Sequence, residues 1–250
     1  MPACSMARAK GTPAPVSSAI VPAVGSALPV GPTTAPIAIP TPPLNLNKLV
    51  RRVPWPKADI IHRVHPDKYL ADQFNPGPAG NARFSPILDA KGNSIPTIYG
   101  GTTFDCAAME TVFHDVPFAP GLKTHAKRKL KAHHYSQVLS VADLTLAELT
   151  TTALRKLGIK RGELIETEKN IYPQTRAWAE AIHAQCPDIQ GLYWISRQDD
   201  RAVAVVLFGD RLGTSPLTVH APSVDIVTDA STYANVVTLA SRIGVKITGK

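Results

Sequence analysis

Hydrophobic and polar positions follow a regular spacing only after about residue 53. Short runs in which apolar residues alternate with polar ones, or are nearly continuous, are typical of strands. Such runs occur at residues 60–65, 94–101, 138–141, 191–196 and 202–208. The last two flank a charged turn at residues 197–201, so we predict that they form a hairpin.

Apolar residues spaced by three and four positions predict helices at residues 103–114, 143–157 and 175–185. Thr102 or Thr103 is a suitable N-cap for the first helix, because a threonine hydroxyl accepts a hydrogen bond from a free N–H in the first turn. Gly158 is a typical stop for the second helix. The third helix ends before Pro187.

The predicted strands occur early and late in the chain, with helices between them and no regular strand–helix alternation. This order favours a single α+β domain with a mixed or antiparallel sheet and flanking helices. It does not favour a Rossmann fold, and no G-x-G-x-x-G motif follows a strand. A dinucleotide site, if present, must therefore be of another kind.

The first 45 residues have a different composition, rich in Ala, Pro, Val, Ser, Thr and Gly. Ten of the chain's 23 prolines precede position 44. Proline removes a backbone donor and disfavours the α region for the residue before it. We therefore predict a disordered leader over residues 1–52 and a catalytic domain over residues 53–250, and we expect that residues 1–45 can be deleted without loss of folding or catalysis.

The leader has no proline-free apolar run long enough for a signal-peptide core or for a membrane span of about 20 residues. We predict a cytoplasmic protein without membrane association. Arg8 and Lys10 resemble the basic start of a signal peptide, so export stays open as an alternative. Cys4, Cys106 and Cys186 are odd in number and far apart, which is typical of a reducing compartment.

The formal net charge is +8, but residues 1–52 carry +5 of it and the remainder only +3. Such a balance is ordinary for a folded domain, and we predict no direct contact with nucleic acid. The basic run at residues 123–134 is typical of a solvated face, although such runs also bind phosphates. The histidines form no H-E-x-x-H motif and the cysteines have no zinc-ligand spacing, so we predict no metal site.

Six stretches, in order along the chain, resemble the RES domain family, named for an arginine, a glutamate and a serine. They are residues 61–64 (IHRV), 82–86 (ARFSP), 98–101 (IYGG), 108–117 (AMETVFHDVP), 172–179 (YPQTRAWA) and 191–197 (GLYWISR). The resemblance implies an ADP-ribosyltransferase-like fold and an enzyme that degrades NAD+. It covers nearly all of residues 60–210 but not the leader. Ala82 departs from the glycine that many members have before the arginine.

Arg63 and Arg83 are the candidate phosphate-binding residues. NAD+ carries a pyrophosphate, and a planar guanidinium meets phosphate oxygens with two parallel hydrogen bonds. Arg63 lies on a predicted strand and Arg83 follows a glycine-rich loop, so a rigid element can direct either side chain into a cleft. The alternative is a surface arginine paired with a nearby acid.

Glu110 is the candidate catalytic carboxylate. It is predicted to lie in the middle of a helix among apolar residues, which favours partial burial. The resemblance implies that it stabilises the positive charge on the ribose as the nicotinamide–ribose bond breaks. Nicotinamide is already a cationic leaving group and needs no proton, so one carboxylate suffices. The alternative is a solvated helix residue.

Tyr99 and Ser196 are the candidate substrate-binding residues. Tyr99 precedes Gly100 and Gly101, where the missing side chains let a ligand approach, and its ring can stack on the nicotinamide. It is otherwise a core tyrosine with a satisfied hydroxyl. Ser196 ends a predicted strand, and its hydroxyl is expected to contact the substrate; this role rests on the resemblance.

The resemblance implies a toxin that cleaves NAD+ by hydrolysis or phosphorolysis, with NAD+ as substrate and no cofactor, neutralised by an Xre-type antitoxin. Two alternatives stay open. One is transfer of ADP-ribose to a protein or small molecule by the same residues. The other is a catalytically silent module that binds a partner. Whether the chain forms a homodimer is open as well.

Overall fold

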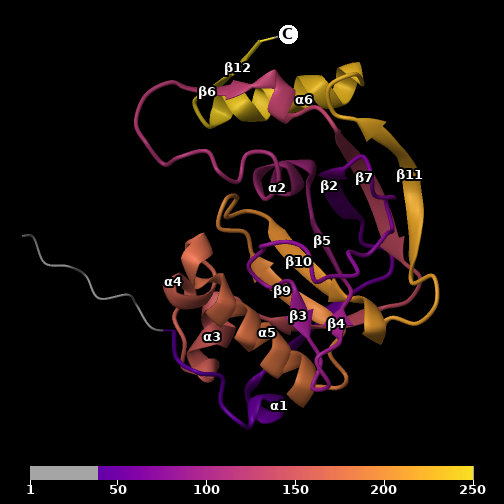
Figure 1. Ribbon diagram of the computed structural model, residues 1–250, viewed down its shortest axis with the longest axis vertical. Helices are drawn as coiled ribbons and strands as arrows, with labels where there is room; N and C mark the ends of the chain where they lie inside the picture. Colours follow the sequence, from indigo (N-terminus) through magenta and orange to yellow (C-terminus); the bar gives the residue numbers. More distant parts are fainter. Residues whose placement is uncertain (1–38, 250) are drawn as a thin grey trace, which may run out of the picture. The chain divides into compact units, whose positions relative to one another are not determined.

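The computed structural model describes residues 39–249, and most of the predicted leader, residues 1–38, lies outside them. An eight-stranded sheet has the spatial order β1-β8-β9-β10-β5-β2-β7-β11 (Figure 1). Its strands are β1 Arg51–Trp55, β2 Ile61–Pro66, β5 Thr97–Gly101, β7 His133–Ser140, β8 Leu144–Glu148, β9 Gly191–Ile195, β10 Val203–Phe208 and β11 Leu217–Asp225. All neighbours are antiparallel except β8 and β9. The predicted α+β class with a mixed sheet is confirmed.

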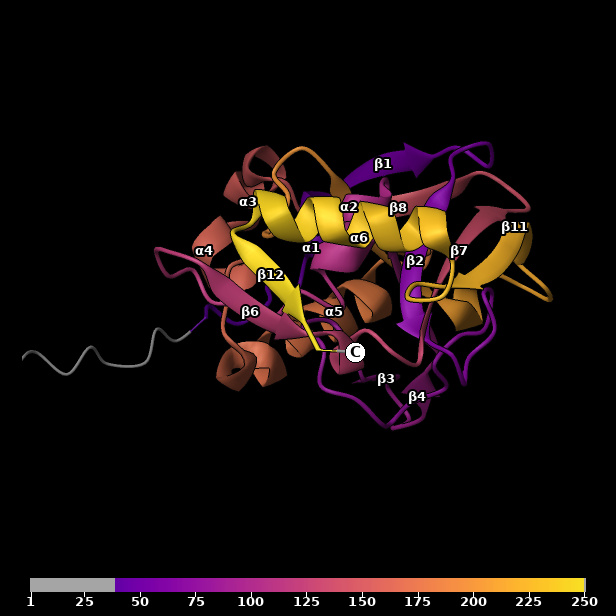
Figure 2. The ribbon, with the colours of Figure 1, turned by 90° about the horizontal axis from the view of Figure 1, so that it is seen from above.

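Helices and small sheets cover this central sheet. The helices are α1 Leu46–Leu49, α2 Phe104–Met109, α3 Thr151–Leu157, α4 Arg161–Leu164, α5 Tyr172–Gln185 and α6 Ala230–Arg242, with 3₁₀ turns η1 Lys127–Lys129, η2 Lys169–Ile171 and η3 Gly209–Arg211. The small sheets pair β3 Ile87–Leu88 with β4 Ser94–Ile95, and β6 Lys123–Ala126 with β12 Val245–Thr248. Figure 2 shows α6 passing over α2, with β6 and β12 beside it. No helix within residues 39–249 is long and apolar enough to cross a membrane.

Two hydrophobic cores meet at α2. One core joins α1, α3 and α5 to one face of the sheet, and includes Trp178, Leu192 and Val206. The other lies under α6 and includes Phe113 and Leu239. The helix α2 supplies Cys106 to the first core and Ala107, Ala108 and Met109 to the second. The first turn of α2 is capped by Thr103, whose hydroxyl accepts from Cys106 N at 3.0 Å. Residues that end α2 are therefore held where both cores converge.

Several predicted elements are confirmed. The strand predicted at residues 60–65 corresponds to β2, and those predicted at residues 191–196 and 202–208 correspond to the antiparallel pair β9–β10. Gly158 ends α3 in the left-handed conformation, with φ of 72°, which glycine adopts without steric cost. Residues 175–185 lie in α5, which begins slightly earlier, at Tyr172.

Two helix predictions are wrong in part. Residues 144–148 form β8 rather than the start of a helix. The strand pairs with β1 on one edge and with β9 on the other. Its consecutive residues Leu146 and Ala147 are fully buried, so both faces of the strand are covered. Pairing and burial therefore override the helical preference of Leu, Ala and Glu. The predicted helix 103–114 ends at Met109, which makes Glu110 its C-cap rather than a mid-helix residue.

Residues 39–52, assigned to the leader from the sequence, fold with the domain. Leu46 and Val50 are buried in the first core, and β1 begins at Arg51 and pairs with β8. The chain before α1 is also fixed by side chains of α5. Trp178 Nε1 donates to the carbonyl of Pro40 at 2.8 Å, and Gln185 Nε2 donates to that of Pro43 at 3.0 Å. The folded domain thus includes residues 39–52, about fourteen residues more than the composition indicates.

These contacts predict two different truncation outcomes. Deleting residues 1–38 should leave the melting temperature unchanged. Deleting residues 1–45 should lower the free energy of unfolding by about 1–3 kcal/mol, because the buried indole N–H of Trp178 loses its acceptor. Thermal melts of both truncations against the full chain test this. Equal melting temperatures for the two truncations would show that residues 39–45 add no stability.

Candidate functional site

A pocket with a volume of about 360 Å³ lies between the sheet, α2 and the start of α5. Its volume is within the range of small-molecule sites. Arg63, Arg83, Tyr99 and Glu110, four of the five residues singled out from the sequence, line it together. The other lining residues are Val64, Asn81, Ala82, Gly100, Ala107, Thr111, His114, Asp115, Lys169, Tyr172, Trp194 and Ala204.

Arg63 extends from β2 and is only 7% exposed. Its Nε donates to the carbonyl of Tyr99 at 3.0 Å and its Nη1 donates to the carbonyl of Ala71. Its Nη2 has no acceptor among residues 39–249. Burial lowers the pKa of Arg63 to about 10, and the charge of the nearby Asp72 acts in the opposite direction. The guanidinium therefore remains charged at neutral pH, with one NH₂ group free for a ligand.

Arg83 lines the same pocket and is 6% exposed. Its Nη1 donates to Thr167 Oγ1 at 2.8 Å, and its guanidinium carbon lies 5.2 Å from the ring centroid of Tyr172. Burial lowers its pKa, and the electrostatic influence of Tyr172 and Glu110 acts in the opposite direction. Neither Arg83 nor Arg63 forms an ion pair within the described part of the chain, so neither is a surface arginine neutralised by an acid.

Glu110 and Ser196 form a hydrogen-bonded pair from distant parts of the chain. Ser196 Oγ donates to Glu110 Oε1 at 2.6 Å and accepts from the backbone N–H groups of Gln198 at 3.0 Å and Asp199 at 3.1 Å. Because both N–H groups approach the hydroxyl oxygen, its single proton is directed to the carboxylate. Ser196 thereby fixes the orientation of Glu110.

The placement of Ser196 differs from the expectation of a substrate contact. The residue is fully buried and is not among the residues that line the pocket. It lies where β9 ends and the chain turns, so the tight turn at residues 196–199 encloses its hydroxyl. The structure thus puts Ser196 against Glu110 rather than at the pocket surface.

Tyr99 presents its ring to the pocket while its hydroxyl points into the protein. The hydroxyl oxygen accepts from Phe84 N at 3.1 Å, and the ring packs edge-on against Trp194, with centroids 6.3 Å apart. Burial raises the pKa of Tyr99 to about 12, so the phenol stays protonated. The residue offers an aromatic surface to a ligand and no reactive oxygen.

The two glycines after Tyr99 serve the packing of the protein. A Cβ on Gly100 would lie 2.3 Å from Ile61 Cγ2 and 3.3 Å from Arg63 Cγ. A Cβ on Gly101 would lie 2.6 Å from Cys106 Sγ. Gly100 also lines the pocket, but the space that a Cβ would fill at either glycine is occupied by β2 or α2. The glycines allow the strand and helix that carry Arg63 and Glu110 to lie close to β5.

Replacing Gly100 by alanine is expected to destabilise the protein by about 1–3 kcal/mol, the usual cost of overpacking a core. It should also displace Arg63 and weaken ligand binding. Gly162→Ala is the matched control, because a Cβ there meets only Glu166 Oε2 at 4.0 Å. Urea unfolding of both variants measures the difference. Equal stabilities would mean that β2 and β5 tolerate a wider separation.

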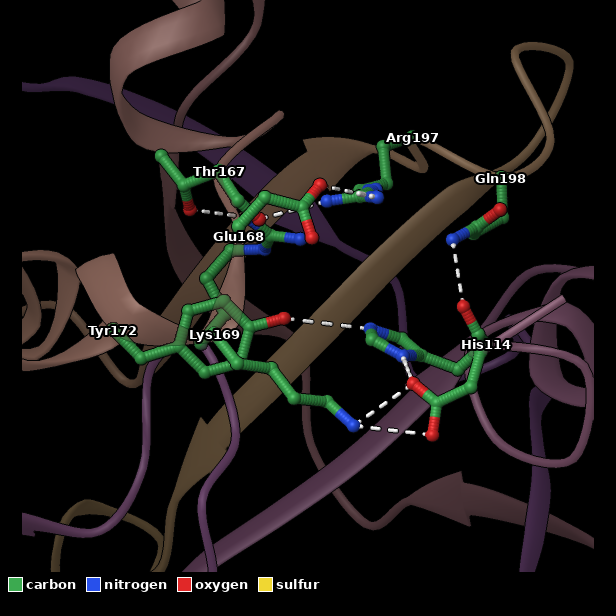
Figure 3. Close-up of polar contacts among 9 residues, drawn as sticks. His114, Thr167, Glu168, Lys169, Tyr172, Arg197 and Gln198 are labelled. Atoms are coloured by element: carbon green, nitrogen blue, oxygen red, sulfur yellow. Dashed lines mark hydrogen bonds and ion pairs between the residues drawn. The ribbon is translucent and has the colours of Figure 1, made fainter. Parts of the chain in front are cut away.

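The sequence-based analysis missed a second polar group in the pocket. His114 and Asp115 follow Glu110, Lys169 begins the 3₁₀ turn η2, and Tyr172 begins α5. Figure 3 shows Tyr172 and Lys169 reaching toward the segment of His114. His114, Asp115 and Tyr172 lie within stretches that carry the family resemblance, which was a usable signal. Nothing in the local sequence marked Lys169.

Within residues 39–249, no group of three or more His, Cys, Asp or Glu is placed to hold a metal ion.

The curled mixed sheet and the arginine-lined pocket define an α+β protein with a candidate site for a small anionic ligand. The sequence profile of the RES domain matches residues 60–229, so the chain belongs to the RES domain family. Its fold is also similar to a chain in the crystal structure of the M. tuberculosis MbcT–MbcA toxin–antitoxin complex. The TM-score is 0.53 at 18% sequence identity, over 73% of this chain and 90% of that chain. No curated protein matches the sequence.

Proposed function

We propose that this chain is an enzyme that breaks the nicotinamide–ribose bond of NAD+ and acts as the toxin of a toxin–antitoxin pair. The observation that carries the proposal is the carboxylate of Glu110, which lines the pocket, is held by the buried Ser196, and shares the pocket with two buried arginines that have no acidic partners in the described residues. Membership of the RES domain family agrees with it, as does the resemblance to a chain from a toxin–antitoxin complex.

The arginines supply the binding site for the pyrophosphate. Arg63 keeps Nη2, and Arg83 keeps Nε and Nη2, without acceptors in the described residues. These groups match a doubly charged pyrophosphate, since charge-assisted hydrogen bonds from guanidinium to phosphate are strong and directional. The aromatic face of Tyr99 is suited to stack on the nicotinamide ring. NAD+ is thus bound as the substrate, and no cofactor takes part.

Glu110 supplies the chemistry. Its Oε1 is held by Ser196, and its Oε2 has no donor among residues 39–249. As the bond between C1″ and the nicotinamide nitrogen breaks, its electron pair neutralises the pyridinium and positive charge develops on the ribose. A carboxylate fixed beside that charge stabilises the transition state without having to reorganise. Because nicotinamide leaves as a neutral molecule, no general acid is needed.

The proposal includes a partner that blocks the pocket. An enzyme that consumes NAD+ in the cytoplasm harms the cell that makes it, so it requires an inhibitor. A protein tail that carries carboxylates can occupy the pyrophosphate position on Arg63 and Arg83. We propose an Xre-type antitoxin as this partner, and the complex then reaches DNA through the antitoxin and not through the basic residues 123–134.

A time course of NAD+ with the purified full chain tests the proposal. Loss of NAD+ with an equal release of nicotinamide is expected. ADP-ribose formed in every buffer indicates hydrolysis, whereas ADP-ribose 1″-phosphate formed only with added phosphate indicates phosphorolysis. Labelled protein bands would instead identify ADP-ribose transfer. If NAD+ persists in every buffer while a partner still binds, the enzyme proposal is wrong and the chain is a catalytically silent module that binds a partner.

A further inference from the structure

The cluster of His114, Asp115, Lys169 and Tyr172 has no role in the cleavage step described above. His114 Nδ1 lies 2.9 Å from Asp115 Oδ1. Lys169 Nζ donates to both carboxylate oxygens of Asp115, at 2.8 and 3.1 Å. On the other edge of the imidazole, Nε2 lies 3.4 Å from the hydroxyl of Tyr172 (Figure 3). All four residues line the same pocket as Glu110.

The hydrogen bonds of this cluster select one tautomer of His114. The bonds from Lys169 and His114 lower the pKa of Asp115 to about 2, so the carboxylate is ionised at neutral pH. An ionised carboxylate only accepts, so Nδ1 of the imidazole must carry the proton. Nε2 is then left with a lone pair. This pattern, an imidazole oriented by a carboxylate, is the one that general bases use.

The lone pair of Nε2 is poorly satisfied by the protein. Its contact with the Tyr172 hydroxyl is 3.4 Å, longer than the about 2.5–3.2 Å of ordinary hydrogen bonds. The His114 side chain is 20% exposed and that of Asp115 is 76% exposed, so the cluster lies at the solvent side of the pocket. A water molecule can therefore reach Nε2 from outside.

We propose that His114 is the general base that activates the acceptor in this reaction, and that the acceptor it serves is water. The inference rests on the proposed function. As the water oxygen forms its bond to C1″ of the ribosyl cation, one water proton passes to Nε2 of His114. ADP-ribose is released, and the imidazolium returns the proton to solvent. Asp115 is a positioning residue that holds the imidazole and stabilises its protonated form.

The other polar groups of the pocket are unsuited to this task. Arg63 and Arg83 are charged donors. Lys169 is engaged with Asp115. The carboxylate of Glu110 is bonded to Ser196 and, in the proposed mechanism, balances the ribosyl charge. His114 is therefore the group in the lining that has both an orienting carboxylate and a free lone pair.

The test compares a nucleophile that must lose a proton with one that need not. For His114→Ala, hydrolysis of NAD+ should fall by about 10²-fold, the usual contribution of a general base. Attack by azide, an anion with no proton to lose, should proceed within threefold of the wild-type rate, and KM for NAD+ should change less than threefold. His220→Ala, at an exposed histidine on β11, is the control and should change neither rate.

Two further variants separate catalysis from folding. In His114→Asn the amide can still donate to Asp115 but has no basic nitrogen, so it should show the same selective loss if the fold is intact. Asp115→Asn should lower hydrolysis by about tenfold or more, because a neutral partner no longer stabilises the imidazolium. Thermal melts report whether each variant is folded.

The outcomes distinguish this inference from the proposed function. If the wild-type chain consumes NAD+ and folded His114→Asn hydrolyses it at the wild-type rate, His114 is not the base and the cleavage proposal stands. Equal losses of hydrolysis and azide attack in that folded variant would likewise overturn the inference, because His114 would then act on the cleavage step. If the wild-type chain does not consume NAD+, both proposals are wrong.

Discussion

Replacing Glu110 by glutamine should lower kcat for NAD+ cleavage by about 10²-fold or more, comparable to the loss of a preorganised transition-state stabiliser. Glutamine has the shape of glutamate and can still accept from Ser196 Oγ, which donates to Oε1 at 2.6 Å. It lacks the negative charge that opposes the ribosyl cation. The dissociation constant for NAD+ should change little, because the charge is needed only as the bond breaks. Steady-state kinetics and equilibrium binding measure the two effects.

Asp105→Asn is the matched control, because Asp105 lies on the same helix α2 and pairs with Arg242 at the surface. Its activity should match the wild type. A double-variant cycle with Ser196→Ala tests whether Ser196 acts through Glu110. The serine substitution should lower kcat in the wild-type background and add little once position 110 is glutamine. An activity of Glu110→Gln within threefold of the wild type would remove Glu110 from its catalytic role.

Replacing Arg83 by alanine should weaken NAD+ binding by about 10- to 100-fold, as expected for the loss of a charge-assisted hydrogen bond worth about 1.5–3 kcal/mol. Arg83→Lys should recover only part of this. Lysine keeps the charge, but it cannot lie flat over Tyr172, bond to Thr167 and present two N–H groups to a phosphate together. Titration of each variant with NAD+ measures the loss. Arg201→Ala, at an exposed arginine outside the pocket, is the control.

The same variant tests the proposed mode of inhibition. If an acidic tail of the antitoxin occupies the pyrophosphate position, Arg83→Ala should weaken binding of the antitoxin together with binding of NAD+. Unchanged affinity for the antitoxin would mean that it blocks the entrance or distorts the site from elsewhere. Arg83 is better suited to this test than Arg63. Removal of Arg63 also leaves the carbonyls of Tyr99 and Ala71 without its N–H donors, which costs stability.

Local patterns in the sequence were sufficient for much of the fold, and the family resemblance was sufficient for most residues of the pocket. The hairpin β9–β10 followed from two apolar runs around a charged turn, and Gly158 ended α3 as expected. Arg63, Arg83, Tyr99 and Glu110 meet in one pocket. The elements depended on short-range periodicity, whereas the four pocket residues were singled out by the resemblance to the RES domain family, together with side-chain chemistry that suits phosphate and cation binding.

The features that were missed depend on contacts between distant residues. Leu144–Glu148 reads as helical by itself and becomes a strand because β1 and β9 pair with it on both sides. Ser196 lies 86 positions from Glu110, and Lys169 lies 54 positions from Asp115. No local pattern could show that Ser196 is enclosed by its own turn, or that Lys169 bonds to the carboxylate of Asp115 beside His114.

The central claim is that Glu110 acts on the nicotinamide ribose of an NAD+ molecule held by Arg63 and Arg83. The most direct test is a crystal structure of the Glu110→Gln variant, which should bind NAD+ without cleaving it. We predict density for intact NAD+ in the pocket, with the pyrophosphate on the two guanidinium groups and the nicotinamide ribose within hydrogen-bond distance of the side chain at position 110. NAD+ bound with its nicotinamide ribose remote from position 110, or bound outside the pocket, would contradict the account.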